Sequence, residues 1–133
     1  MEQIDKITRY KVAFAYRVAS MIAEADDDVS TEEMVLLTEA FPRELLDGLG
    51  FVDDAAGFTD AYHEAILGAL EVLPDHLPED EKLGLITLFT RMVYADGALH
   101  PREAQLLLEA GEYLGLSRDK LSEHLRPLFP KDA

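Results

Sequence analysis

The chain has 133 residues, 48% of them hydrophobic, which predicts a folded domain with a proper core rather than a disordered segment. It has no cysteine, and this excludes disulfides, thiolate metal sites and cysteine nucleophiles. The 27 acidic residues outnumber the 12 basic ones and give a net charge of −15, which would repel nucleic acids and anionic membranes.

The N-terminal segment, MEQIDKITRYKVAFAYR, contains no uninterrupted apolar run. A secretory signal or a membrane-spanning helix needs such a run, so we expect no direct membrane insertion. Together with the lack of cysteine, this predicts a cytoplasmic protein. The acidic balance fits binding of cations or basic proteins, and it equally fits simple solubility or a saline cytoplasm.

Three helices are predicted in the first part of the chain. Residues 4–24 carry apolar side chains at helical spacing: Ile7, Phe14, Val18, Met21 and Ile22. Ser30 and Glu33 then form a capping-box pattern, which predicts a second helix that runs to about Phe41. Pro42 favours the first position of a short helix that ends at about Leu49.

A loop with the sequence FVDDAAG follows at residues 51–57, and residues 58–73 are predicted to be a helix that Pro74 stops. Small residues in this helix predict close packing against a neighbouring helix. They are Ala61, Ala65, Gly68 and Ala69.

Three further helical segments are predicted in the last part of the chain. The first spans residues 79–94, with apolar residues Leu83, Ile86, Phe89 and Val93. The second begins at Pro101 and has an apolar stripe of Ala104, Leu107, Leu108, Gly111 and Leu114. Ser117 caps the third, which ends before Pro127. No segment shows convincing strand alternation, so we predict an all-α fold, a single-domain bundle of about six to seven helices over residues 1–133.

The sequence contains an internal repeat. AEADDDVSTEEMVLLTEA at residues 23–40 aligns without gaps on VYADGALHPREAQLLLEA at residues 93–110, with a constant offset of 70 residues. Asp26 aligns with Asp96, and Glu33 aligns with Glu103. Each copy reads as a helix, an acidic turn and a second helix, so we predict two helical hairpins related by a pseudo-two-fold axis.

The second copy matches the latter half of a calcium-binding EF-hand loop. Asp96, Gly97 and Glu103 fit the fifth, sixth and twelfth positions, which hold a ligand, an invariant glycine and a bidentate glutamate. Met92 and Tyr94 stand at the first and third positions, where oxygen ligands are expected. Because each half-loop is incomplete, we hypothesise that the two repeated turns face each other and share their ligands.

The turn ADG-x-L-H-P-x-E before an apolar helix resembles the TerB-like family, named for the tellurite-resistance protein TerB; a related domain occurs in the co-chaperone DjlA. The resemblance covers about residues 5–125 and implies an all-helical domain with an acidic, metal-binding centre. Ala98 has no side-chain oxygen where the first copy has Asp28, so one shared site is implied rather than two equal ones. The implied metal ligands are Asp26, Asp28, Glu33, Asp96 and Glu103.

The chemistry of these residues supports two interpretations. Ca²⁺ and Mg²⁺ prefer carboxylate and carbonyl oxygens, so a divalent cation of this kind is the cofactor that we favour. Asp26 and Asp96 each follow the C-terminus of a predicted helix, whose partial negative charge disfavours another anion unless a cation or backbone amides compensate. Without a metal, the acidic turns serve as turns, and Glu33 and Glu103 serve as helix caps.

The histidines and the known catalytic motifs give weaker evidence for a functional site. His100 lies beside the second acidic turn and is either a further ligand or a helix cap. His63, His76 and His124 are isolated and lack the i, i+4 pairing of a zinc-binding helix, so we interpret them as ordinary surface or core residues. No G-x-S-x-G elbow, phosphate loop or Rossmann glycine pattern occurs, and we predict no enzymatic activity.

Three hypotheses remain. In the first, the chain is a cytoplasmic TerB-like module in which a divalent cation joins the two hairpins and presents a surface to another protein. The resemblance alone suggests its association with a stress response. In the second, the chain is a metal-free helical adaptor or scaffold. In the third, which we favour least, a metal at the acidic turns assists hydrolysis.

Overall fold

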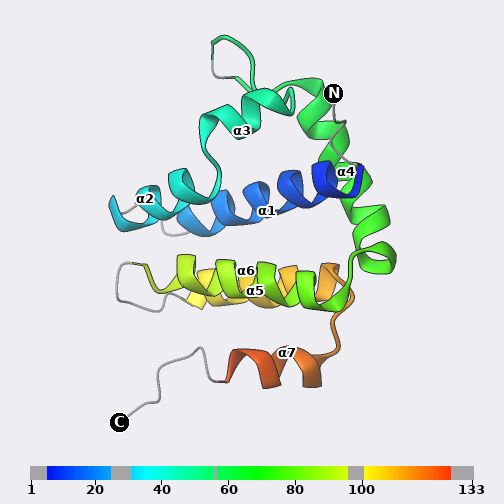
Figure 1. Ribbon diagram of the computed structural model, residues 1–133. Coiled ribbons are helices and arrows are strands. Elements are labelled where there is room, and N and C mark those ends of the chain that lie inside the picture. Colours follow the sequence, from blue (N-terminus) through cyan, green and yellow to red (C-terminus); the bar gives the residue numbers. More distant parts are fainter. Residues whose placement is uncertain (1–5, 25–30, 56, 96–100, 127–133) are drawn as a thin grey trace.

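The structure is a computed structural model that describes residues 6–24, 31–55, 57–95 and 101–126. Within these residues the chain forms seven α-helices (Figure 1), and Val52 and Phe58 form an isolated β-bridge. The helices are α1 (Lys6–Glu24), α2 (Thr31–Ala40), α3 (Arg43–Gly48), α4 (Asp60–His76), α5 (Glu79–Val93), α6 (Pro101–Tyr113) and α7 (Arg118–Leu125). The predicted all-α fold is confirmed.

Helix α1 occupies the centre of the bundle and packs against α2, α4, α5 and α6. In Figure 1, α1 and α2 lie above the layer formed by α5 and α6, and α7 lies below that layer. The buried side of α1 consists largely of alanines, which lets the neighbouring helices approach closely. Phe14 fills the larger space toward α5, where its ring meets the Phe89 ring edge-on at a centroid distance of 6.3 Å.

Close packing of α4, predicted from its small residues, is confirmed at the contact with α1. A Cβ added at Gly68 would lie 2.5 Å from Cε1 of Tyr10, so a glycine is needed for the tyrosine ring to pass. Ala65 and Ala69 of α4 are buried as well.

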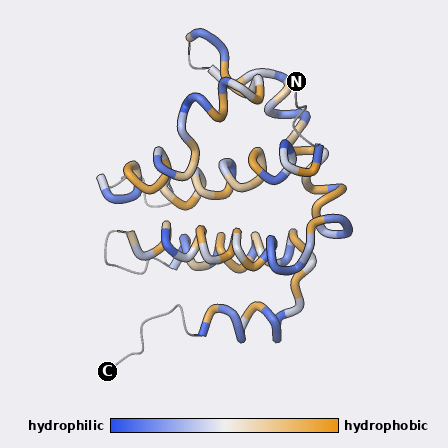
Figure 2. Tube along the Cα trace, viewed as in Figure 1, coloured by the Kyte–Doolittle hydropathy of each residue, from blue (hydrophilic) through white to orange (hydrophobic). Residues whose placement is uncertain are grey.

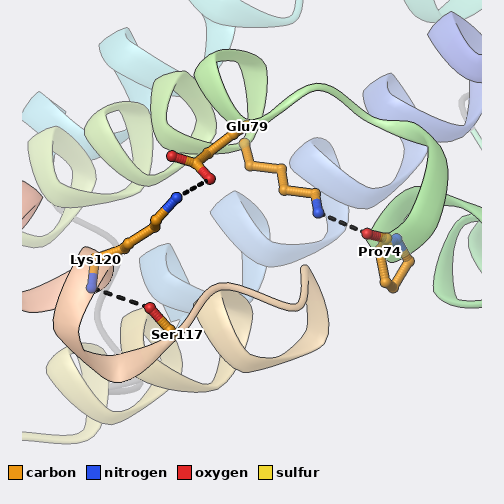
Figure 3. Close-up of polar contacts among 5 residues, drawn as sticks. Pro74, Glu79, Ser117 and Lys120 are labelled. Carbon is orange, nitrogen blue, oxygen red and sulfur yellow. Dashed lines mark hydrogen bonds and ion pairs between the residues drawn. The ribbon is translucent and has the colours of Figure 1, made fainter.

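The prediction that Pro74 stops this helix is wrong, because α4 continues through Pro74 to His76. Proline removes one backbone N–H near the helix end, and the next turn still closes: the Leu77 N–H donates to the Leu73 carbonyl at 3.0 Å. The Pro74 carbonyl, in the last turn, accepts a hydrogen bond from Lys82 Nζ at 2.6 Å, as marked in Figure 3. This ammonium group from α5 also suits the negative end of the α4 dipole.

The start of α7 follows the local capping rule, whereas Pro42, predicted as the first residue of its helix, immediately precedes α3. Ser117 Oγ accepts a hydrogen bond from the Lys120 N–H at 3.2 Å, which confirms the predicted cap of α7. Lys120 Nζ then pairs with Glu79 Oε2 at 2.5 Å and links α7 to the start of α5 (Figure 3). The predicted cap Ser30 lies outside the described residues.

The apolar stripe predicted for α6 differs from the observed buried face. Leu107, Gly111 and Leu114 are buried as expected, but Leu108 is exposed and Leu106 is buried in its place. The buried face is rotated toward Leu106 because α6 packs against both α5 and α1. The stripe was predicted from residue spacing along this helix alone, without its neighbouring helices.

The first helices of the two repeated hairpins, α1 and α5, have matching buried positions near their C-terminal ends. Residues 70 apart on α1 and α5 are buried together: Ala19 with Phe89, Ile22 with Met92, and Ala23 with Val93. Figure 1 shows α1 and α5 running in the same direction, so that their C-terminal ends lie at the same end of the bundle.

Candidate functional site

The structure describes two of the five predicted metal ligands. Glu33 is the third residue of α2, and Glu103 is the third residue of α6. Asp26, Asp28 and Asp96 lie outside the described residues. Within the described part of the chain, no group of three or more His, Asp or Glu side chains forms a metal-binding arrangement, so the five-residue site stays a prediction.

Burial distinguishes Glu33 and Glu103 from ordinary first-turn acids. Glu33 is 1% exposed and Glu103 is 0% exposed, whereas Glu79, Asp80 and Glu81 in the first turn of α5 are all exposed. Burying a carboxylate costs several kcal/mol unless charges or hydrogen bonds compensate it. Cap formation does not require that cost, because a capping glutamate can remain at the surface. Burial of the first-turn glutamate therefore occurs at both equivalent positions of the repeat.

The helix ends next to the two acidic turns lie at one end of the bundle. In Figure 1, α1 and α5 end, and α6 begins, at the same end of the bundle. Contacts of α2 with α1 and α5, and of α6 with α1 and α5, hold these ends in one body. Carboxylates at the two first turns therefore belong to the same end of the molecule.

A pocket of about 220 Å³ opens near this region, between α1, α2 and the start of α4. Its aromatic part consists of Tyr16, Phe58 and Tyr62, with centroid distances of 5.8 Å from Tyr16 to Phe58 and 4.6 Å from Phe58 to Tyr62. Met34 and Leu37 of α2 also line the pocket. The polar lining is Arg17, Ser20, Glu24 and His63.

Tyr62 is the titratable group that the pocket perturbs. Burial raises the pKa of its phenol to about 12, because the phenolate would lose its hydration. The Arg17 charge partly offsets this rise in pKa, and Tyr16 adds to it. The phenol therefore stays protonated at neutral pH and is a hydrogen-bonding group rather than a base.

Ser20 differs from its equivalent in the second hairpin. Thr90, 70 residues later, donates its hydroxyl to the Ile86 carbonyl at 2.8 Å. The Ser20 Oγ is buried and has no hydrogen-bond partner among the described residues. An unsatisfied buried hydroxyl costs roughly 1–3 kcal/mol of stability.

Of the three histidines that the structure describes, His124 contacts another helix, and His76 Nδ1 lies 3.2 Å from the Val72 carbonyl within α4. His124 Nε2 lies 2.7 Å from Thr87 Oγ1, and this hydroxyl also lies 3.1 Å from the Leu83 carbonyl. Since the hydroxyl has one proton and the carbonyl accepts it, Nε2–H of His124 is the donor to Thr87. The pair therefore attaches α7 to α5 and does not activate Thr87 as a nucleophile. His63 lines the pocket, and His100 lies outside the described residues.

Sequence reasoning did not identify the pocket residues Tyr16, Ser20, Phe58 and Tyr62. A signal was present in the repeat: Met34, which lines the pocket, stands where the second copy has the smaller Ala104. A larger apolar residue at an equivalent helix position indicates a surface with a different environment.

None of the helices in the described ranges is both long enough and apolar enough to cross a membrane. The fold and the two repeated hairpins define a small, acidic, all-helical module. Comparison with protein families matches residues 13–124 to the family described as tellurite resistance protein TerB, and the chain belongs to this family. Neither the curated proteins nor the solved structures that were compared contain a match.

Proposed function

We propose that this chain is a cytoplasmic TerB-like module that binds a divalent cation through its two acidic turns and acts as an interaction domain associated with a stress response. The observation that carries the proposal is the pair of buried carboxylates, Glu33 and Glu103, at equivalent positions of the two hairpins. A cation near both carboxylates would add favourable charge interactions at this end of the bundle.

The ligand set fits a hard cation. Five carboxylates, from Asp26, Asp28, Glu33, Asp96 and Glu103, provide the oxygens that Ca²⁺ and Mg²⁺ prefer. When bound, the cation would supply positive charge between the hairpins. The side chains would fix the distance between the first turns of α2 and α6. The surface presented to a protein partner would then depend on the metal.

The second candidate is a metal-free adaptor. It is supported by the capping-box spacing of Ser30 and Glu33 and by the place of both glutamates in a helix's first turn, where the dipole favours an acid. Catalysis is not part of either proposal. A metal-assisted hydrolase would need turnover of a substrate in addition to metal binding.

Thermal unfolding of chelator-treated protein, followed by circular dichroism with and without Ca²⁺, Mg²⁺, Mn²⁺ or Zn²⁺, tests the proposal. A cation that binds only the native state raises the free energy of unfolding by about 2.7 kcal/mol at a hundredfold excess over its dissociation constant. Asp26→Asn, Asp96→Asn and Glu103→Gln should abolish this increase while they leave the helical content largely intact.

Glu112→Gln is the matched control, because it removes the same charge from an exposed position on α6 and should retain the metal response. All samples are kept at one ionic strength with KCl, so that general screening does not imitate binding. No increase with any of the four metals at millimolar concentration would reject the metal site and favour the adaptor.

A further inference from the structure

Helix α2 is attached to the bundle differently from its equivalent in the repeat, α6. Glu33 is the one fully buried side chain of α2. The apolar residues of α2 that pack against the core are only half-buried: Leu36, Leu37 and Ala40. At the equivalent positions of α6 the glutamate and the apolar residues are all buried: Glu103, Leu106, Leu107 and Ala110. Interactions of a carboxylate therefore contribute a larger share of the attachment of α2 than of α6.

Helix α2 also has little stability of its own. It has 10 residues, and an isolated helix shorter than about 12–15 residues is marginal in water. Figure 2 shows hydrophilic residues on both sides of its apolar middle, and two of the apolar residues there, Met34 and Val35, are 48% and 50% exposed. Segments with few buried apolar contacts open at a lower free energy than the core of a protein. We therefore expect α2 to open more readily than α6.

An aromatic contact fixes the C-terminal end of α2. Phe41, directly after the helix, is buried, and its ring meets the Tyr16 ring of α1 edge-on at a centroid distance of 5.3 Å. The Phe41 N–H donates to the Leu37 carbonyl at 2.9 Å, which joins this anchor to the last turn of α2. Glu33 lies about two turns before Phe41. Helix α2 is therefore a strap with a carboxylate anchor at its first turn and an apolar anchor at its end.

The strap lies beside the pocket between α1, α2 and α4. Met34 and Leu37 of α2 line this pocket together with Ser20 and Ala23 of α1. Ala23 is 1% exposed, and its equivalent in the second hairpin, Val93, is 0% exposed. Release of the first turn of α2 removes two of the lining side chains, and the pocket becomes part of an open surface on α1.

We propose that α2 is the switching element of this protein. Interactions of Glu33 hold it against the bundle, and their loss releases α2 about its anchor at Phe41 and opens the pocket, while α6 stays in place. Glu33 is one of the five proposed metal ligands, so closing of α2 is the response to the cation. In this respect the inference rests on the proposed function, and it names the helix through which the metal changes the surface.

Native-state hydrogen exchange of the wild-type protein compares the two helices without any variant. In chelator, the amides of residues 35–40 should exchange about tenfold or more faster, relative to their intrinsic rates, than those of residues 105–110. Urea below the unfolding transition should accelerate exchange in α6 and leave it nearly unchanged in α2, because a local opening exposes little surface. Equal protection and equal urea dependence of the two sets would overturn the proposal.

Two equivalent variants test the order of opening. Glu33→Gln should lower the protection of both sets of amides by a common factor of about ten or more, because local release and global unfolding both break its interactions. Glu103→Gln should lower the protection of α6 and leave that of α2 unchanged, since α6 stays in place when α2 opens. Glu32→Gln, at an exposed position of α2, is the control and should change neither set. Unchanged α2 protection in Glu33→Gln, or reduced α2 protection in Glu103→Gln, would overturn the proposal.

Thiol labelling tests whether the pocket opens with the strap. The chain has no cysteine, so a single introduced thiol reports on one position. With the aromatic disulfide reagent DTNB, the thiol of Ala23→Cys should react about tenfold or more faster than that of Val93→Cys, because release of α2 exposes only the first position. The rates are corrected for the free energy of unfolding of each variant, and equal corrected rates would overturn the proposal.

Repeating both measurements with Ca²⁺, Mg²⁺, Mn²⁺ or Zn²⁺ separates this inference from the proposed function. A cation that raises the melting temperature should also slow exchange of residues 35–40 and labelling of Ala23→Cys. A higher melting temperature with unchanged exchange and labelling would overturn the switch and retain the metal site. An unchanged melting temperature with all four metals would reject the metal site and, with it, the cation as the signal that closes α2.

Discussion

Tyr62 lies where the aromatic part of the pocket meets the start of α4, and its environment favours the neutral phenol. The Phe58 ring stacks on it at 4.6 Å, and Tyr16 lies 6.1 Å away between ring centroids. Burial is the main cause of its raised pKa of about 12. This side chain therefore couples the pocket to the stability of the protein at alkaline pH.

The expected pH dependence has a definite sign. Above pH ~10 the phenol ionises in the unfolded chain, while in the folded chain it keeps its proton until about pH 12. The stabilisation is complete below pH ~10 and is lost as the pH rises toward 12. Urea unfolding at pH 9 and 11.5 should show a loss in wild type that is about 1–2 kcal/mol larger than in Tyr62→Phe. Tyr113→Phe, at an exposed position, is the control; equal losses in wild type and Tyr62→Phe would contradict the assignment.

Single residues also mark the limit of sequence reasoning at the candidate site. Glu33 and Glu103 were predicted as ligands from a repeat of acidic turns, and their near-complete burial was not foreseen. The sequence pattern of an acid in the first turn of a helix is the same whether its side chain faces solvent or the interior. Only the neighbouring helices decide which of the two occurs.

At the scale of elements, the contact between α1 and α4 depends on a glycine. Gly68→Ala should destabilise the protein by about 1–3 kcal/mol, because the added Cβ would meet the rigid ring of Tyr10 at 2.5 Å. Gly84→Ala is the matched exchange on α5, where no atom lies within 4 Å of the new Cβ. It should stabilise by about 0.5–1 kcal/mol through helix propensity. Urea unfolding measures both, and a stabilising Gly68→Ala would show that the helices can separate without cost.

The connection between α4 and α5 provides a second contrast, which Figure 3 shows. Lys82 is largely buried and donates to the Pro74 carbonyl, whereas the Lys120 pair with Glu79 is exposed. Lys82→Met should therefore cost about 1.5–3 kcal/mol, the range of a hydrogen bond from a charged group. Lys120→Met should cost at most about 1 kcal/mol. Chemical denaturation tests the pair, and equal effects of the two changes would refute the distinction by burial.

Helix boundaries were predictable to the extent that local rules decide them. Ser117 caps α7 as expected, because the hydroxyl needs only an N–H three residues later. The predicted stop at Pro74 was wrong because the rule for proline in a helix interior does not hold in the last turn. Lys82, eight residues later in the sequence, then supplies a partner for the Pro74 carbonyl.

At the scale of the whole molecule, the net charge of −15 on a small bundle produces self-repulsion. Raising KCl from about 10 to 300 mM shortens the Debye length from roughly 30 Å to below 10 Å and screens this repulsion. The melting temperature of chelator-treated protein should therefore rise with salt. A melting temperature that falls or stays constant over this range would mean that attractive ion pairs outweigh the repulsion.

The sequence by itself determined the all-helical class, most helix positions, the cap of α7 and the two repeated hairpins. These features depend on spacing and on interactions within a few residues, which the order of amino acids specifies directly. The tertiary structure alone decided that Glu33 and Glu103 are buried, that Leu108, Met34 and Val35 are exposed, and that Tyr16, Phe58 and Tyr62 surround a pocket. Each of these outcomes depends on which helix covers a given side chain, and the periodicity of one helix carries no information about its neighbours.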